Sequence, residues 1–263
     1  MKKLTTLLLV LPLLLSACGG SDNAPRPTVT LADSGSVKST PPAGPTTPSG
    51  PTSTPGSGGG VAGQPVALQA ADGVVMRAHL YATQAPKRKV VILAHGANED
   101  QKDWQALAQE LASRGVAALT LDFRGFGETG GTRDTSKLAD DLATAVRYLK
   151  SEDWPLVYIV GSDIGGTAAL KVAANEELAG VVTISALPRV TGLDAMSDVS
   201  KIVEPKLFLA ASGDSAAASA VRIMAGVASE PKMSLIVEGT TSHGIVLLQV
   251  ATAKQALLTF INP

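Results

Sequence analysis

The sequence predicts an α/β domain with a mostly parallel, eight-stranded sheet and helices on both of its faces. Two observations lead to this fold class: short, continuously apolar runs recur along the chain, and segments with helical spacing separate them. Strands that are buried on both faces of a parallel sheet have continuous apolar sequences of this kind. Strands and helices that alternate along a chain form layers in which helices cover the sheet.

Two alternating runs open the domain on either side of Ala71-Asp72-Gly73, and an Asp-Gly pair in this setting predicts a hairpin. The expected strands of the hairpin are 66–70 and 74–81, and the expected parallel strands are 90–94, 117–123, 156–160, 181–186, 206–211 and 233–237. Trp104–Ser113 and Leu138–Leu149 carry apolar residues three and four positions apart, which predicts helices between these strands.

The N-terminus resembles the signal of a bacterial lipoprotein. Lys2 and Lys3 precede an apolar run, 4–15, which is too short to span a bilayer comfortably as a permanent helix. Leu15-Ser16-Ala17-Cys18 follows, and it resembles a lipobox. The resemblance implies a signal peptide over residues 1–17, cleavage before Cys18, and a diacylglyceryl group and an acyl chain on that cysteine. More than one chain is what stable anchoring to a lipid bilayer requires. The alternative is an ordinary secretory signal.

A lipoprotein signal implies a protein of the cell envelope that faces the extracytoplasmic side, on the outer membrane if the source is Gram-negative. Residues 18–63 would form the lipidated cysteine and a disordered stalk, because 41–60 consists almost entirely of Pro, Thr, Ser and Gly. Residues 64–263 then form one domain. Its partner would be a small-molecule substrate or ligand.

Composition excludes several other classes of function. The 22 basic and 23 acidic residues nearly balance, so we expect no nucleic-acid partner. Cys18 is the only cysteine, which excludes an internal disulfide. The sequence has no recognisable metal-ligand spacing and no phosphate-binding loop, so we expect neither a metal nor a cofactor.

The most informative segment is Gly161-Ser162-Asp163-Ile164-Gly165, at a predicted junction between a strand and a helix. A nucleophile on such a tight turn needs small residues two positions before it and two positions after it, where the strand and the helix crowd together. The two glycines flank Asp163 in this way, whereas larger residues flank Ser162. We therefore expect Asp163 at the tip of the turn and Ser162 directed away from the site.

This junction resembles the nucleophile elbow of the α/β-hydrolase superfamily, in the branch that carries aspartate in place of serine. The resemblance implies a catalytic triad in the chain order nucleophile, acid and base. Asp163 would be the nucleophile, Asp214 at the end of a strand the acid, and His243 the base. The backbone N–H groups of Ala97 and Ile164 would form the oxyanion hole.

The chain also departs from that branch, which includes haloalkane dehalogenases and epoxide hydrolases. Those enzymes usually have Trp where this chain has Ile164, and they carry a cap domain for which the segment 187–205 is too short. We therefore expect a capless fold and do not transfer either activity. His95 is expected to be a structural histidine, and Arg124 to brace loops. Asp214 could instead serve only as the cap of the next helix.

Three hypotheses about function remain open. The first is a hydrolase that uses the Asp-His-Asp triad on an unknown small or exposed substrate. The second is a catalytically inactive relative that binds a ligand or an envelope partner, because two carboxylates beside one imidazole favour its protonated form, which is a poor base. The third is a serine hydrolase that uses another residue, such as Ser185 or Ser242.

Overall fold

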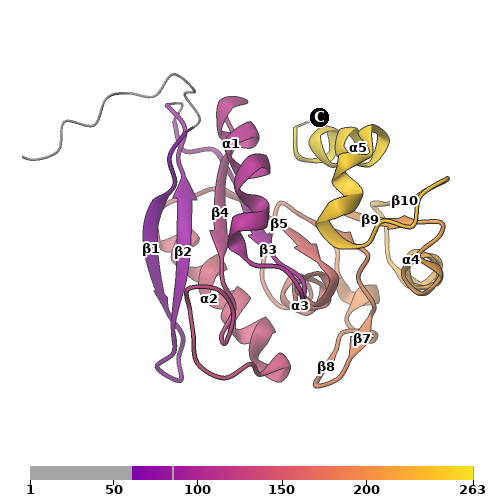
Figure 1. Cartoon of the computed structure of the whole chain (residues 1–263), viewed down its shortest axis with the longest axis horizontal. Helices are drawn as coiled ribbons and strands as arrows, with labels where there is room; N and C mark the ends of the chain where they lie inside the picture. Colours follow the sequence, from indigo (N-terminus) through magenta and orange to yellow (C-terminus); the bar gives the residue numbers. More distant parts are fainter. Residues whose placement is uncertain (1–60, 85, 263) are drawn as a thin grey trace, which may run out of the picture. The chain divides into compact units, whose positions relative to one another are not determined.

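The structure is a computed structural model, and it describes residues 61–84 and 86–262 (Figure 1). The expected signal peptide, Cys18 and the stalk as far as residue 60 lie outside the described residues. Within the described part of the chain, no helix has both the length and the apolar character that crossing a bilayer requires.

The core of the domain is an eight-stranded sheet with the strand order β1-β2-β4-β3-β5-β6-β9-β10. The strands are β1 (Gln64–Gln69), β2 (Val75–Tyr81), β3 (Lys89–Ala94), β4 (Ala117–Leu121), β5 (Leu156–Ser162), β6 (Gly180–Ile184), β9 (Lys206–Ala211) and β10 (Lys232–Val237). Strand β2 pairs antiparallel with β1 and β4, and every other pair in this sheet is parallel. The strand order confirms the predicted fold class.

Five α-helices cover the two faces of the sheet in the described residues (Figure 1). They are α1 (Gln105–Ser113), α2 (Leu138–Ser151), α3 (Asp163–Ala173), α4 (Ser215–Val227) and α5 (Ala251–Ile261). The buried residues of α1 and α5 belong to one apolar cluster, and those of α2, α3 and α4 belong to a second. The sheet therefore separates two hydrophobic cores.

Strand β3 shows why the apolar runs are continuous. Val90, Ile92 and Ala94 pack into the cluster with α2, α3 and α4, whereas Val91 and Leu93 pack into the cluster with α1 and α5. Side chains alternate between the two faces of a strand, so a strand that is covered on both faces must be apolar at every position.

The predicted hairpin is confirmed by the pairing of β1 with β2. Gly73 has a φ of +90°, in the left-handed region that glycine adopts without strain. A carboxylate oxygen of Asp72 accepts a hydrogen bond of 3.3 Å from the backbone N–H of Val74. An Asp and a Gly at the turn thus supply the side-chain acceptor and the backbone conformation that it requires.

A second, smaller hairpin was not predicted. It consists of β7 (Arg189–Val190) and β8 (Leu193–Asp194), and it lies in the segment between β6 and β9. The Lys171 side chain of α3 holds this segment, because its Nζ donates to the Asp194 carbonyl at 3.1 Å and pairs with Asp198 at 3.2 Å. The segment is therefore a short hairpin fixed to α3 and not a cap domain.

Short 3-10 helices precede several of the regular helices. η1 (Gln101–Trp104) leads into α1, and η2 (Thr135–Lys137) leads into α2. The 3-10 helix η4 (Gly244–Gln249) follows β10 and precedes α5. A further one, η3 (Val199–Lys201), follows the small hairpin.

Candidate active site

Asp163 stands at the tip of a sharp turn between β5, which ends at Ser162, and α3, which begins at Asp163 itself. Its φ of +45° is unusual for a residue with a side chain. A Cβ atom on Gly161 would clash with the Gly165 carbonyl oxygen, and one on Gly165 would lie 2.5 Å from the His95 carbonyl oxygen. The two glycines are thus required by backbone crowding on either side of Asp163.

Ser162 lies beneath the elbow and not at its tip. Its side chain is completely buried, and its hydroxyl donates a hydrogen bond of 2.9 Å to Oε1 of Glu99. The serine of this turn is therefore directed into the protein, and the carboxylate of Asp163 takes the exposed position.

The two oxygens of the Asp163 carboxylate have different environments. Oδ2 accepts a hydrogen bond of 3.0 Å from the backbone N–H of Ala97, in the loop after β3. Oδ1 lies 3.9 Å from Nε2 of His243. Ile164 is in the first turn of α3, where backbone N–H groups have no acceptor within the helix. One oxygen is thus held by a backbone donor, and the other faces the imidazole.

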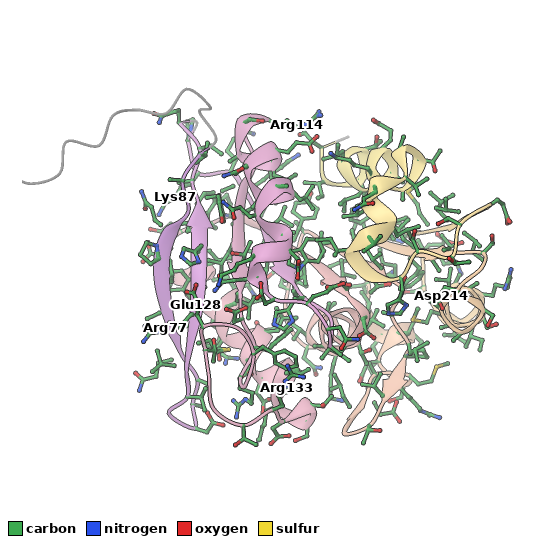
Figure 2. The ribbon with its side chains drawn as sticks, in the orientation of Figure 1. Arg77, Lys87, Arg114, Glu128, Arg133 and Asp214 are labelled. Atoms are coloured by element: carbon green, nitrogen blue, oxygen red, sulfur yellow. The ribbon has the colours of Figure 1, made fainter. Side chains whose placement is uncertain are left out.

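Asp214 and His243, the other two residues predicted for the triad, lie within hydrogen-bond distance of each other (Asp214 is labelled in Figure 2). Nδ1 of His243 donates a hydrogen bond of 2.6 Å to Oδ2 of Asp214. The other oxygen of Asp214, Oδ1, accepts from the backbone N–H of Ala217 at 3.2 Å and so caps α4. The two roles considered for Asp214, partner of a histidine and helix cap, are therefore filled by the same side chain.

The parallel sheet brings these residues together. Asp163 follows β5, Asp214 follows β9 and His243 follows β10, and the donor Ala97 follows β3. The carboxyl ends of parallel strands lie at one edge of a sheet, which is where ligands bind in folds of this kind. The site is open, since 54% of the His243 side chain and 20% of the Asp163 side chain are exposed.

Glu99 is the residue of this site that the sequence did not reveal. Its Oε2 accepts from the backbone N–H of Gly96 at 2.7 Å, and its Oε1 accepts from the Ser162 hydroxyl and from the backbone N–H of Ile245 at 3.1 Å. Ser162 is 63 positions away in the chain and Ile245 is 146 positions away. A glutamate in a polar loop gives no local signal of such contacts.

His95 has a structural role in the loop after β3. It is completely buried, Nδ1 donates to the Gly96 carbonyl at 2.8 Å, and Nε2 accepts from the backbone N–H of Phe123 at 3.1 Å. Burial lowers the pKa of His95 below its usual value, which favours the neutral ring that this pair of hydrogen bonds requires. The imidazole thus joins the loop after β3 to the loop after β4.

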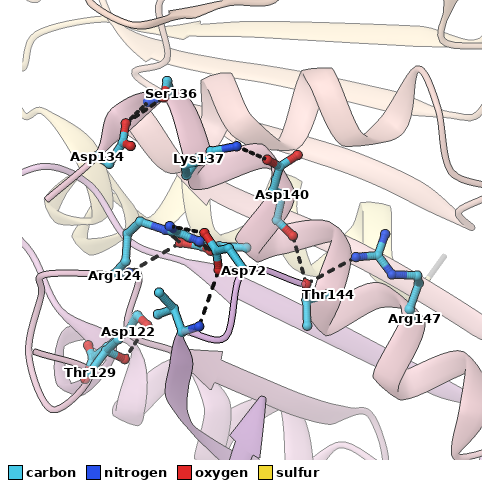
Figure 3. A network of polar contacts seen from close by, with 12 residues as sticks. Asp72, Asp122, Arg124, Thr129, Asp134, Ser136, Lys137, Asp140, Thr144 and Arg147 are labelled. Carbon is cyan, nitrogen blue, oxygen red and sulfur yellow. Dashed lines mark hydrogen bonds and ion pairs between the residues drawn. The ribbon is translucent and has the colours of Figure 1, made fainter. Parts of the chain in front are cut away.

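Arg124 braces the loops on the face that carries α2 (Figure 3). Its guanidinium forms a two-pronged pair with the buried carboxylate of Asp141, with contacts of 2.6 and 2.9 Å, and reaches Asp72 of the hairpin at 2.7 Å. The hydrogen bonds that Arg124 donates to Asp141, followed by the one to Asp72, raise the pKa of Arg124, and Arg124 lowers the pKa of Asp72. The network ties the hairpin to α2.

The two alternative serines are placed differently from Asp163. Ser185, after β6, also has a positive φ, +53°, but its side chain is completely buried. The hydroxyl of Ser242 forms a hydrogen bond of 2.8 Å with that of Thr240. Over residues 61–84 and 86–262, no group of three or more His, Cys, Asp or Glu side chains is arranged to hold a metal ion.

Comparisons with known proteins agree with this architecture. GrgF, an α/β hydrolase from Penicillium sp., has a TM-score of 0.66 and 16% identity, and the match covers 76% of this chain and 98% of that one. A dienelactone hydrolase from Anabaena variabilis has a TM-score of 0.65 and 19% identity, with 76% and 96% covered. At these identities, the likeness establishes the α/β-hydrolase fold alone.

Two curated relatives match shorter regions. A monoacylglycerol lipase from Mycolicibacterium smegmatis is 31% identical over 117 residues, which are 43% of this chain and 42% of that protein. The quorum-quenching protein AidA from Acinetobacter baumannii is 28% identical over 127 residues, which are 45% of this chain and 41% of that protein. The chain thus spans about two fifths of the length of these relatives.

One family model covers most of the domain, from residue 85 to residue 256. The description of that family names a serine, whereas the tip of the elbow in this chain is Asp163. The matched region contains the elbow, Asp214 and His243. The chain therefore belongs to the hydrolase family that is described as serine aminopeptidase, S33.

Proposed function

We propose that the protein is a hydrolase that cleaves a bond at a saturated carbon atom and forms an ester with Asp163 on the way. His243, oriented by Asp214, would then direct water to that ester. One observation carries the proposal: Oδ2 of Asp163 is held by the Ala97 N–H at 3.0 Å, while Oδ1 faces Nε2 of His243 at 3.9 Å.

In the first step, Oδ1 of Asp163 attacks the carbon atom of the substrate. The C–Oδ1 bond forms as the bond to the leaving group breaks, and the leaving group departs with the electron pair. A carboxylate needs no base for this attack, because it has no proton to lose. The hydrogen bond from Ala97 to Oδ2 holds the carboxylate so that Oδ1 is presented to the substrate.

In the second step, Nε2 of His243 takes a proton from water, and the resulting hydroxide adds to Cγ of Asp163. Negative charge develops on Oδ2, which faces the Ala97 N–H, and the first turn of α3 supplies Ile164 as a second donor. Donors aimed at such an oxygen are worth about 2.7–4 kcal/mol each where they have been measured. The Cγ–Oδ1 bond then breaks, and the alcohol leaves with the proton from His243. Asp163 is left as a carboxylic acid and loses its proton to water, which restores the carboxylate.

The same chemistry limits the class of substrate. Attack by a carboxylate on a carboxylic ester would give a reactive anhydride, so we expect little activity on esters, although relatives of this chain are named as lipases and esterases. Dehalogenases usually have Trp at the position of Ile164. The side chain of His243 is exposed to solvent. We therefore expect a small or exposed substrate whose leaving group is stable in water without help from the protein.

The decisive experiment traps the ester. Purified wild type, Asp163→Asn and His243→Gln are incubated with a panel of haloalkanes, and the intact masses are compared. His243→Gln should retain the alkyl group on the peptide that contains Asp163, wild type should turn over, and Asp163→Asn should do neither.

An isotope experiment tests the second step. A single turnover of wild type in ¹⁸O-water should leave one ¹⁸O atom on Asp163, because water attacks Cγ and an original carboxylate oxygen leaves with the alcohol. Equal background hydrolysis by wild type and Asp163→Asn, with no adduct on His243→Gln, contradicts catalysis through Asp163. The catalytically inactive relative that binds a ligand or an envelope partner then becomes the better explanation.

We also propose that the domain is anchored to a membrane of the cell envelope through Cys18. Support comes from the sequence alone, in the order of basic residues, apolar run and lipobox. Expression in a bacterium with labelled palmitate should give a labelled protein in the membrane fraction. A Cys18→Ser variant should be unlabelled, and labelling of that variant would contradict the proposal.

A further inference from the structure

The geometry points to Glu99 as a positioning residue that fixes the oxyanion donor, the nucleophile and the base in their positions relative to one another. This inference rests on the proposed function, because it assigns a role to Glu99 within the same site. Three segments of the chain meet at its carboxylate: the loop that carries Ala97, the elbow that carries Asp163 and the loop that carries His243.

The first contact shapes the loop after β3. The Gly96 N–H donates to Oε2 of Glu99 at 2.7 Å, and the Glu99 N–H donates to the Gly96 carbonyl at 3.3 Å. The turn from Gly96 to Glu99 is therefore closed by both the backbone and the side chain. Ala97 lies within this turn, and its N–H points at Oδ2 of Asp163. The direction of the oxyanion donor thus depends on Glu99.

The second and third contacts reach the other two segments. Oε1 of Glu99 accepts from the hydroxyl of Ser162, the residue before Asp163, and from the backbone N–H of Ile245, two residues after His243. Gly244 has a φ of +60°, and a Cβ atom there would clash with Glu99 and with Ser162. This glycine lets the histidine loop approach the carboxylate closely.

These contacts require a carboxylate. The three donors converge on two oxygens, and an ionised carboxylate is purely an acceptor, whereas the amide of Gln has one acceptor and two donors. Glu99→Gln would therefore set an N–H group of the new amide against an N–H or O–H donor. Hydrogen bonds to an ionised group are also stronger than those between neutral groups. The role of Ser162 is then to donate to Glu99.

The test compares Glu99→Gln with a matched change elsewhere. Glu152→Gln is the same substitution at a carboxylate that pairs on the surface with Lys87. We expect Glu99→Gln to lower the rate of ester formation on Asp163 and the rate of its hydrolysis by about 10²-fold, the cost of a small misplacement of reacting groups. Glu152→Gln should leave both rates unchanged.

An NMR measurement separates this inference from the proposed function. In wild type, the Ala97 amide proton and the Nδ1 proton of His243 should resonate downfield, because both donate to carboxylates. In Glu99→Gln, the Ala97 signal should move upfield, as it should in Asp163→Asn, and the His243 signal should broaden. These shifts support positioning even if no substrate in the panel reacts with wild type.

If Glu99→Gln does not fold, Ser162→Ala removes a single donor and serves in its place. It should move the Ala97 signal upfield and broaden the His243 signal, both by a smaller amount. Unchanged signals in Ser162→Ala and in a folded Glu99→Gln overturn the inference, even where wild type forms the ester. Shifts of equal size in Glu152→Gln overturn it as well.

Discussion

Nδ1 of His243 and Oδ2 of Asp214 lie 2.6 Å apart, although 29 positions separate the two residues in the chain. The same Asp214 carboxylate caps α4 through its other oxygen, at 3.2 Å from the Ala217 N–H. The helix thereby fixes the carboxylate, and the carboxylate fixes the imidazole ring. Asp214 should therefore affect only one of the two steps of the proposed reaction, because only the hydrolysis of the ester needs a base.

Asp214→Asn should therefore slow one step and spare the other. The amide keeps an oxygen for the cap of α4 but turns an NH₂ group towards His243, which leaves Nε2 with the proton and unable to act as a base. Ester formation on Asp163 should keep its rate, and hydrolysis of the ester should fall about 10²–10⁴-fold, the usual contribution of a general base. Rapid-quench mass spectrometry measures both rates. An equal loss in both steps would show that Asp214 does more than orient the base.

Asp163→Ser should convert the site to a weak esterase. The substitution gives the elbow a hydroxyl nucleophile within reach of His243, and it frees the Ala97 N–H to bind an oxyanion. We expect hydrolysis of p-nitrophenyl acetate about 10²-fold above that of Asp163→Ala, at the low end of general-base catalysis. Labelling by a fluorophosphonate should appear in Asp163→Ser and be absent from wild type. Labelling of wild type would place the nucleophile elsewhere.

The elbow could be predicted from the sequence because its cause is local. Crowding between a strand and the helix after it acts over two positions on each side, so Gly161 and Gly165 alone select Asp163 as the tip. Asp214 and His243 were predicted from the chain order that the family resemblance implies, together with the buried strands that they follow, whose apolar runs are visible in the sequence. These features depend on short stretches of chain or on a regular topology.

The features that the sequence missed depend on contacts between distant segments. Glu99 acquires its role from Ser162 and Ile245, which reach it only after the sheet has formed. The hairpin of β7 and β8 has strands of two residues each, too short to show an alternating pattern, and Lys171 of α3 holds the segment in place. The signal peptide and the lipid anchor stay predictions.

Gly165→Ala and Gly226→Ala should have opposite effects on stability. A Cβ atom at Gly165 would lie 2.5 Å from the His95 carbonyl oxygen and 2.6 Å from that of Ala94, and neither backbone group can easily move. The free energy of unfolding should fall by about 3 kcal/mol, the cost of a severe clash in a packed interior. At Gly226, within α4, there is open space around the new Cβ, and alanine should stabilise by about 0.5–1 kcal/mol. Urea unfolding of both variants measures the difference, and a neutral Gly165→Ala would refute the crowding argument.

His95 should make the domain sensitive to mild acid. Because burial lowers its pKa in the folded state, the unfolded chain binds more protons between that lowered value and the ordinary value of about 6.5. The contribution of His95 is then complete above about pH 6.5 and is lost as the pH falls below it, with a slope of at most about 1.4 kcal/mol per pH unit. Carboxylates with a lowered pKa, such as Asp72, lose their contribution only in a more acidic range. Protonation at Nε2 would also break the hydrogen bond from the Phe123 N–H.

The measurement is urea unfolding of wild type and His95→Gln at a series of pH values between about 5 and 7, the range in which an imidazole titrates. Gln carries no proton that titrates there, so the variant should be less stable at neutral pH but should lose less stability on acidification. If the two proteins lose stability in parallel, the acid sensitivity arises from other groups. In that case the protonated imidazole is tolerated in the folded domain as well as in the unfolded chain, which contradicts the effect assigned to its burial.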